Sequence, residues 1–145
     1  MKKVDNRELG RQGERIAREY LVKNGYEILA SNYYASHKEI DIIAFDREYI
    51  VFVEVKCRTL TAKTLAHRPA SAVGWRKRSN IVDAANRFML ENCSAEFMRD
   101  RCVRVDVIEV IVPPLDKRYE SGEELKLSSI SINHIRNAFY SDASL

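Results

Sequence analysis

The chain has few of the residues that build disulfide frameworks or zinc sites. Its three cysteines, Cys57, Cys93 and Cys102, lack C-x-x-C spacing, so neither a disulfide framework nor a zinc site is expected. We expect all three to be buried or partly buried free thiols. The histidines are scattered and form no ligand motif. His37 stands near acidic residues, where it is either a phosphate or water contact or a surface-loop histidine.

Long apolar runs, repeats and a strong charge bias are also missing. The longest apolar runs are of strand length and Met1 to Glu8 is polar, so we expect neither a membrane span nor a signal peptide, and a cytoplasmic location. A length of 145 residues with 46% hydrophobic content predicts one domain over residues 1–145. The net charge is +3, but the acids concentrate in one region. The rest of the surface is therefore more basic, which favours a polyanionic partner.

The sequence does contain charged residues inside two apolar runs. Glu39 to Phe45 and Ile50 to Arg58 are rich in Ile, Val and Phe, and a short loop from Asp46 to Tyr49 separates them. This spacing predicts an antiparallel hairpin in which Phe45 faces Ile50. Because a buried charge is costly unless it is paired or bound to a metal, the charges in these runs need an explanation.

The predicted register places Asp41 opposite Glu54 and Glu39 opposite Lys56, with all four side chains on one face. Two opposed carboxylates repel, so Asp41 and Glu54 need a cation, a shared proton or a different register. Carboxylate oxygens suit Mg²⁺ or Mn²⁺. The structural alternative is an ordinary Glu39–Lys56 ion pair beside a slipped, solvated edge.

A lysine next to such a site has a chemical use. Lys56 can position or help deprotonate an attacking water, or offset charge on a pentavalent phosphorus. An acid on one strand, followed by an acid, one spacer and a lysine on the next, is typical of metal-dependent phosphodiester cleavage. Asp41, Glu54 and Lys56 are therefore the first candidates for catalytic residues, with Glu39 as a secondary one.

Five segments carry a recognisable pattern: Gly10 to Ala17, Asn24 to Leu29, Glu39 to Ala44, Val51 to Arg58 and Arg104 to Ile108. In this order they resemble the YraN-like bacterial proteins. This largely uncharacterised family is placed in the PD-(D/E)XK, or restriction-endonuclease-like, nuclease superfamily, near the archaeal Holliday-junction resolvases. The resemblance implies a metal-dependent nuclease fold, with DNA as the substrate. Lys38 stands where the family usually has Gly, and Val105 where Phe is commoner.

A first helix is predicted from Asn6 to Asn24, with an apolar stripe at helical spacing and Gly25 placed to end it in the left-handed conformation. Glu14 lies at the border of that stripe. The resemblance implies that an acid from this helix completes the metal site, and Glu14 matches the position. The alternative is an intrahelical ion pair of Glu14 with Arg18 or Arg11.

The remaining pattern predicts further strands and helices around the hairpin. Together they indicate an α/β fold with a mixed five-stranded sheet flanked by helices, in agreement with a restriction-endonuclease-like core. The predicted elements are a strand from Tyr26 to Tyr34, a helix from Gly74 to Leu90, strands from Cys102 to Val112 and from Leu125 to Ile132, and a short helix from Asn133 to Phe139.

Basic residues around the predicted site are candidates for contacts with nucleic acid. Lys77 projects toward the core side of its helix and matches a lysine expected in the family, so we expect it, with Arg58, to contact backbone phosphates. Arg11 and Arg78 are further candidates, although Arg78 also fits a solvated basic cluster.

We therefore expect an Mg²⁺- or Mn²⁺-dependent endonuclease that hydrolyses DNA phosphodiester bonds, on branched or repair and recombination substrates. The alternative is a nucleic-acid-binding module of the same fold that cleaves little or nothing, and a protein-interaction role is a third. A homodimer would let two sites cut two strands.

Overall fold

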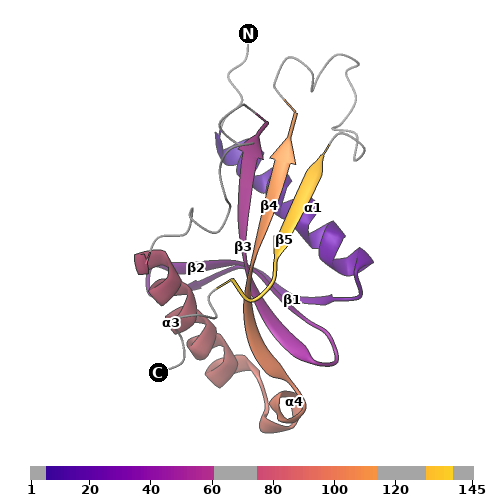
Figure 1. The fold of residues 1–145 in the computed structure, drawn as a ribbon. Helices are drawn as coiled ribbons and strands as arrows, with labels where there is room; N and C mark the ends of the chain where they lie inside the picture. The colour runs from indigo at the N-terminus through magenta and orange to yellow at the C-terminus, as the bar shows by residue number, and fades with distance from the viewer. Residues whose placement is uncertain (1–5, 61–74, 114–129, 139–145) are drawn as a thin grey trace.

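Five strands form one mixed sheet in the computed structural model, which describes residues 6–60, 75–113 and 130–138, without the side chains of residue 6 and residues 75–77. The strand order is β1-β2-β3-β4-β5, and only β3 and β4 run parallel. Figure 1 shows β3, β4 and β5 side by side, with β1 and β2 turning away from them. The elements are α1 (Asn6–Lys23), β1 (Glu27–Ala35), β2 (Lys38–Phe45), β3 (Tyr49–Thr59), α3 (Trp75–Asn92), α4 (Ala95–Arg99), β4 (Cys102–Val112) and β5 (Ser131–Ile135).

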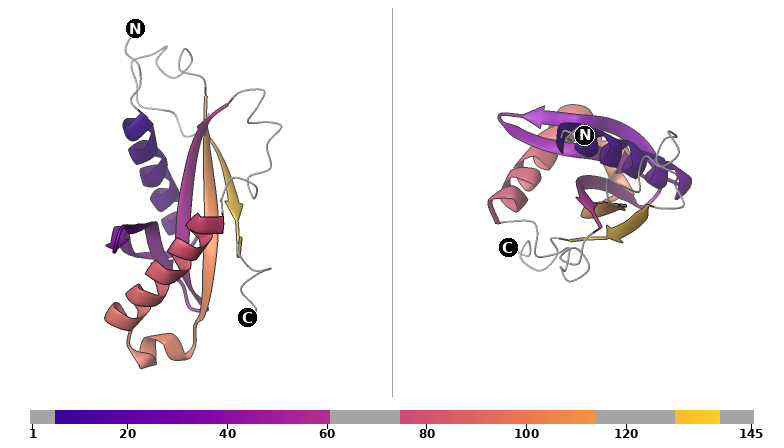
Figure 2. Two further views of the ribbon diagram at one scale, coloured as in Figure 1. Left: turned by 90° about the vertical axis from the view of Figure 1, so that its left-hand side faces the viewer. Right: turned by 90° about the horizontal axis from the view of Figure 1, so that it is seen from above.

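Helices cover both faces of the sheet, because β3 is apolar on both sides. Val51 and Val53 pack with Ile16 of α1, whereas the intervening Phe52 packs with Ile81 of α3. Figure 2 shows β3, β4 and β5 edge-on, with α1 along one side. A strand that is buried on both faces reads as a continuous apolar run, as this one does. The expected mixed five-stranded α/β fold, of restriction-endonuclease-like class, is confirmed.

The predicted catalytic hairpin forms with the predicted turn. Phe45 pairs with Ile50, and the ladder continues in the same register to Ile42 and Val53. Asp46 closes the turn, because its Oδ1 accepts hydrogen bonds from the backbone N–H groups of Glu48 at 2.9 Å and Tyr49 at 2.7 Å. The side chain of Asp46 therefore stabilises the turn locally.

The preceding hairpin explains why Lys38 can replace a glycine. Its turn is centred on Ser36 and His37, which both have positive φ values of 48° and 67°, as a two-residue turn requires. Lys38 itself belongs to β2, where it pairs with Ala35. Its Nζ lies 2.7 Å from Asp83 Oδ2 of α3, so the replacement ties the hairpin to that helix.

Several predicted boundaries needed correction at the carboxyl end of the chain. The short helix predicted from Asn133 to Phe139 is wrong, because residues 131–135 form β5 and pair with β4. Of the strand predicted from Leu125 to Ile132, residues 131 and 132 belong to β5, and residues 125–129 lie outside the described part of the chain. Helix α4 was not predicted, and Cys102 is exposed rather than buried. The strand from Cys102 to Val112 is confirmed in full.

Gly13 sets how closely α1 approaches the sheet. A Cβ atom at Gly13 would lie 2.7 Å from Cys57 Cβ and 3.0 Å from its Sγ, closer than real side chains come. The close contact also carries Glu14, the next residue, toward the strands. Gly25, with a φ of 90°, ends the helix region in the left-handed conformation, as predicted.

We expect Gly13→Ala to lower the free energy of unfolding by about 1–3 kcal/mol, because the new methyl group has no room against Cys57. Gly10→Ala is the matched control: nothing lies within 4 Å of its added Cβ. That control should gain up to about 1 kcal/mol from helix propensity. Urea denaturation measures the free energy of unfolding of both variants. Equal values for Gly13→Ala and Gly10→Ala would show that Gly13 has room for a methyl group against Cys57.

A buried polar network joins β4 to β5, to α1 and to Tyr26, the residue before β1. Arg104 donates from Nε to Asp106 Oδ1 at 2.8 Å and from Nη2 to Tyr26 OH at 2.7 Å. His134 Nε2 lies 2.6 Å from Asp106 Oδ2, and Tyr20 OH is 3.2 Å from His134 Nδ1. Asp106 is fully buried. Burial alone would raise the pKa of Asp106, but hydrogen bonds from His134, Arg104 and the Asn137 backbone lower it.

We expect Asp106→Asn to cost about 3–5 kcal/mol at pH 7, because it leaves the Arg104 charge buried without its carboxylate. An aspartate of lowered pKa stabilises the fold above its unfolded pKa near 4 and loses that effect as the pH falls through its folded pKa. The difference in free energy of unfolding between wild type and Asp106→Asn should therefore become smaller below about pH 4. Asp83→Asn, at an exposed ion pair with Lys38, should cost about 1 kcal/mol or less. Denaturant titrations across pH measure the loss in free energy of unfolding of each variant. Equal losses for Asp106→Asn and Asp83→Asn at pH 7 would contradict this account.

Candidate metal centre

The candidate site lies where two strands separate. The ladder between β2 and β3 ends at Ile42 and Val53. Beyond that point β3 stays paired with β4 as far as Thr59, while β2 stays paired with β1 as far as Lys38. Figure 1 shows β2 turning away from β3 there. We call this separation the strand fork.

Asp41 occupies the strand fork. Its Oδ2 accepts a hydrogen bond of 2.8 Å from the backbone N–H of Val55, which has left the ladder with β2. A backbone N–H in the interior needs an acceptor, and the carboxylate supplies it. One oxygen of Asp41 therefore has a structural task, and a carboxylate has a second oxygen for other contacts.

The predicted cross-strand pairs are wrong, although the register from which they were derived is right. Asp41 and Glu54 lie just past the last pair of the ladder, and so do Glu39 and Lys56. On the other edge of β2, Glu39 pairs with Tyr34 of β1. The backbone ladder ends before these residues, yet Glu39, Asp41 and Glu54 still line one hollow.

Three acids converge at the strand fork from two elements. Glu14 of α1 and Glu39 and Asp41 of β2 each offer a carboxylate oxygen, and these oxygens lie within 4.8 Å of one another. We call Glu14, Glu39 and Asp41 the acid cluster. Glu39 was a secondary candidate in the sequence, but the structure places it with the other two. The alternative partner of Glu14, Arg11, pairs with Glu8 at 3.0 Å.

Glu54 and Lys56 stand beside the acid cluster. Glu54 is 3% exposed, and its Oε1 lies 3.5 Å from Lys56 Nζ. Lys56 therefore has Glu54 as its ion-pair partner in place of the predicted Glu39. A hollow of about 360 Å³ opens over these groups. It is lined by His37, Lys38, Glu39, Asp41, Glu54, Asn80 and Ile81.

The pKa values show that the acids repel one another. Burial, followed by the charge of Glu54, raises the pKa of Asp41 to about 8, against the lowering effect of the Val55 hydrogen bond. Burial and the charge of Glu39 likewise raise the pKa of Glu14, whereas Asn32 and Arg18 lower it. Burial and repulsion between carboxylates thus both favour the protonated forms of Asp41 and Glu14.

Asn32 is a member of the site that the sequence reasoning missed. Its side-chain amide nitrogen, oriented toward the carboxylates, lies 3.0 Å from Glu14 Oε2 and 3.2 Å from Glu39 Oε1. This β1 residue has a φ of 51°. An asparagine within a run of strand-forming residues is the sequence signal for such a left-handed position.

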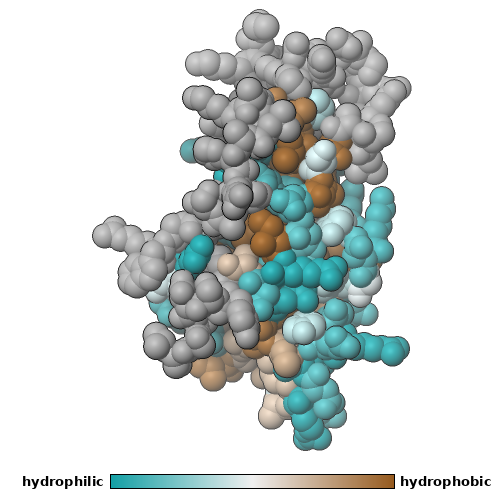
Figure 3. Space-filling view, in the orientation of Figure 1, coloured by the Kyte–Doolittle hydropathy of each residue, from teal (hydrophilic) through white to brown (hydrophobic). Residues whose placement is uncertain are grey.

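The candidate phosphate contacts are scattered around the site. Arg58 Nε lies 3.4 Å from Glu109 Oε1, on the face of β3 opposite α1, where Figure 3 shows hydrophilic and hydrophobic atoms intermixed. Arg11 is exposed on α1. Arg78 is partly buried near the start of α3, and the Lys77 side chain lies outside the described residues.

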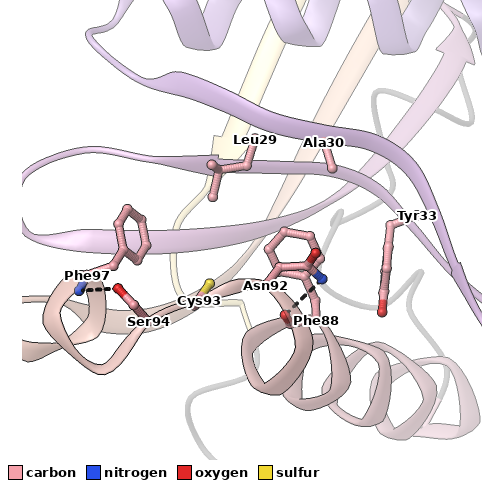
Figure 4. A pocket seen from close by; sticks show the side chains of 8 residues that line it. All are labelled: Leu29, Ala30, Tyr33, Phe88, Asn92, Cys93, Ser94 and Phe97. Carbon is pink, nitrogen blue, oxygen red and sulfur yellow. Dashed lines mark hydrogen bonds between the residues drawn. The ribbon is translucent and has the colours of Figure 1, made fainter.

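A second hollow lies at the other end of α3. It measures about 570 Å³ and is framed by Tyr33 and Phe88, whose rings meet edge to face with centroids 5.1 Å apart, and by Phe97 of α4 (Figure 4). Its lining includes none of the acids. The acidic hollow and this aromatic one are therefore chemically distinct.

The sheet order, the two covering helices and the acids at the strand fork define the restriction-endonuclease-like class. Residues 13–110 match the uncharacterised protein family UPF0102. A UPF0102 protein of Caldanaerobacter subterraneus subsp. tengcongensis is 39% identical over 96% of this chain and 100% of its own length. One from Chlorobium chlorochromatii is 41% identical over 92% of each chain. The chain belongs to the UPF0102 family, the YraN-like proteins that its motifs resemble. Among the described helices, none is long and apolar enough to cross a membrane.

We expect Asp41→Asn to stabilise the metal-free protein at pH 8. The folded pKa of Asp41 is raised to about 8, against about 3.9 when unfolded, so the folded state binds more protons and loses stability as the pH rises between these values. Asparagine stays neutral and keeps an oxygen for Val55 N–H. Since one pKa unit is worth about 1.4 kcal/mol, the gain should be about 2 kcal/mol or more.

Thermal denaturation in EDTA at pH 8 and pH 4 measures this gain, which should be smaller at pH 4. Asp100→Asn, an exposed residue at the end of α4, is the matched control and should change little. An Asp41→Asn variant that is less stable than wild type at pH 8 would show that the Asp41 charge is not a source of strain.

Proposed function

We propose that this protein is a metal-dependent endonuclease that hydrolyses DNA phosphodiester bonds. The observation that carries the proposal is the convergence of Glu14, Glu39 and Asp41 within 4.8 Å, next to the Glu54–Lys56 ion pair. A strand fork with acids and a lysine of this kind is what the restriction-endonuclease-like fold uses for such chemistry, so fold and site support the same reaction.

The residues present fit Mg²⁺ or Mn²⁺. Each member of the acid cluster offers a hard oxygen donor, and such donors suit these ions better than they suit zinc or copper. Burial and the charges of neighbouring carboxylates raise the pKa values of Asp41 and Glu14, and a bound cation would oppose both effects. Asp41, Glu14 and Glu39 would hold the ion, and Glu54 lines the acidic hollow together with Glu39 and Asp41.

When bound, the ion supplies a water of lowered pKa and offsets charge on the leaving oxygen. The chain itself positions the reaction. Asp41 is fixed by Val55 N–H, so its free oxygen has a defined direction. Lys56 Nζ lies 3.5 Å from Glu54 Oε1, from which it can donate a hydrogen bond to the attacking water or to a phosphate oxygen.

DNA as the substrate is supported by the family's superfamily placement and by basic residues near the site. Arg58 and Arg78 lie on the same side of the sheet as the acidic hollow, and Lys77 precedes Arg78 on α3. Arg11 lies one helical turn before Glu14 on α1. Arg58 also pairs with Glu109, so phosphate binding would compete with that contact. Branched and recombination intermediates are the finer proposal, with a homodimer providing two sites.

The test is cleavage of supercoiled plasmid, single-stranded DNA and four-way junctions by purified protein in Mg²⁺ or Mn²⁺. We expect EDTA to abolish cutting, and Asp41→Asn and Lys56→Gln to reduce it about 100-fold or more, through loss of a metal ligand and of the lysine's help to water. Because Asp41→Asn should stabilise the fold, its lost activity cannot be blamed on unfolding.

Asp100→Asn and Lys23→Gln make the same chemical changes at exposed positions away from the site, and they should keep full activity. Cutting that persists unchanged in Asp41→Asn would show a contaminating nuclease. Salt-dependent DNA binding by wild type without turnover in either metal would replace the nuclease with the binding module of the same fold.

A further inference from the structure

Asn32 holds an unusual backbone position directly beside the acid cluster. The β1–β2 ladder pairs Ser31 with Ile42 and Tyr33 with Ile40, so Asn32 lies opposite Asp41 between these two pairs. Its φ of 51° is in the left-handed region, which residues other than glycine seldom adopt within a strand. Asparagine is one of the few residues that tolerate it, together with glycine and aspartate.

The amide of Asn32 bridges two acids that would otherwise repel each other. Its nitrogen lies 3.0 Å from Glu14 Oε2 and 3.2 Å from Glu39 Oε1, so both of its protons can be donated. The orientation follows from the neighbours, because carboxylate oxygens accept hydrogen bonds and an amide oxygen in that place would face only acceptors. The bridge joins α1 to β2 across β1.

In the same place, the side-chain amide of Asn32 can adopt either of two orientations. Rotation about χ2 exchanges the nitrogen and oxygen of an asparagine at almost the same two points. A cation among the carboxylates would repel the amide protons and attract the oxygen. The rotated amide would then offer a neutral oxygen of the type that Mg²⁺ and Ca²⁺ accept from asparagine and backbone carbonyls.

We propose that Asn32 is a two-state amide of the metal centre: its nitrogen holds Glu14 and Glu39 together before a divalent cation binds, and its oxygen faces the cation afterwards. This inference rests on the metal-binding part of the proposed function, and it assigns Asn32 as a positioning residue and metal ligand.

The chemistry of the alternatives explains why asparagine suits this place. Glycine would satisfy the backbone but would leave Glu14 and Glu39 without a bridge. Aspartate would also satisfy the backbone but would add a further carboxylate to a site that already contains four, counting Glu54.

The first experiment measures Mn²⁺ binding by calorimetry in wild type, Asn32→Gly and Asn32→Asp. We expect Asn32→Gly to bind about 10-fold more weakly, because a ligand is lost, and Asn32→Asp to bind about 10-fold more tightly, because a charged ligand replaces a neutral one. In EDTA at pH 7, Asn32→Asp should also melt at a lower temperature than wild type, since the added carboxylate faces Glu14 and Glu39 without a donor.

Asn137→Gly is the matched control. Asn137 also has a positive φ, of 54°, but it lies in the turn after β5. If Asn32 served only the backbone conformation, Asn32→Gly would behave like this control and would bind Mn²⁺ as tightly as wild type. That result would overturn the inference.

The second experiment follows the side-chain NH₂ signals of Asn32 by ¹⁵N NMR during a titration with diamagnetic Mg²⁺, with the signals assigned by their absence in Asn32→Gly. We expect them to shift as the nitrogen leaves the carboxylates. Those of Asn24, whose Nδ2 donates to Tyr20 O at 2.7 Å at the end of α1, should stay in place.

These measurements separate the inference from the proposed nuclease activity. Wild type that binds no Mn²⁺ would overturn both. Wild type that binds Mn²⁺ while the Asn32 signals stay fixed and the variants bind equally would overturn the inference alone. Binding in the expected order, Asn32→Asp, wild type and then Asn32→Gly, would support the inference even if no DNA were cut.

Discussion

The hydrogen bond from Val55 N–H to Asp41 is the contact on which the candidate site depends. It closes the strand fork with a side chain where β2 no longer supplies a backbone acceptor. Without such an acceptor, a separation of two apolar strands would leave a polar backbone group unsatisfied in the interior. The same bond fixes one oxygen of Asp41. One residue therefore supplies the missing backbone acceptor and also orients a carboxylate oxygen that could bind a metal ion.

Concentrated negative charge is the second constraint, and it opposes the stability of the fold. Glu14, Glu39 and Asp41 gather closely, Glu54 adds its charge to theirs, and burial and this repulsion raise the pKa of Asp41 to about 8. Lys56 and the Asn32 amide offset part of the repulsion. Carboxylates that are held close together in spite of their repulsion lower the stability of the fold, and the same arrangement suits the binding of a cation.

The frame behind the site is held by apolar packing and by one buried polar network. Gly13 lets α1 lie against Cys57, which brings Glu14 toward the strands. Asp106 accepts from Arg104 and lies beside His134, and these contacts tie β4 and β5 to α1 through Tyr20. Such satisfied buried networks fix one arrangement of elements. Apart from Asp41, which accepts from Val55 N–H, the acids take no part in these frame contacts.

Sequence periodicity alone determined the hairpin, its turn, the strand from Cys102 to Val112 and the α/β class, because strand alternation and turn chemistry act over a few residues. It also singled out Asp41, Glu54 and Lys56 as charges out of place in apolar runs. Only the tertiary structure decided that the β2–β3 ladder stops at Ile42 and Val53, and that Glu39 and Asn32 join Glu14. Where a sheet divides depends on the packing of α1 and α3 against its two faces, which involves residues far apart in the chain and leaves no local pattern to read.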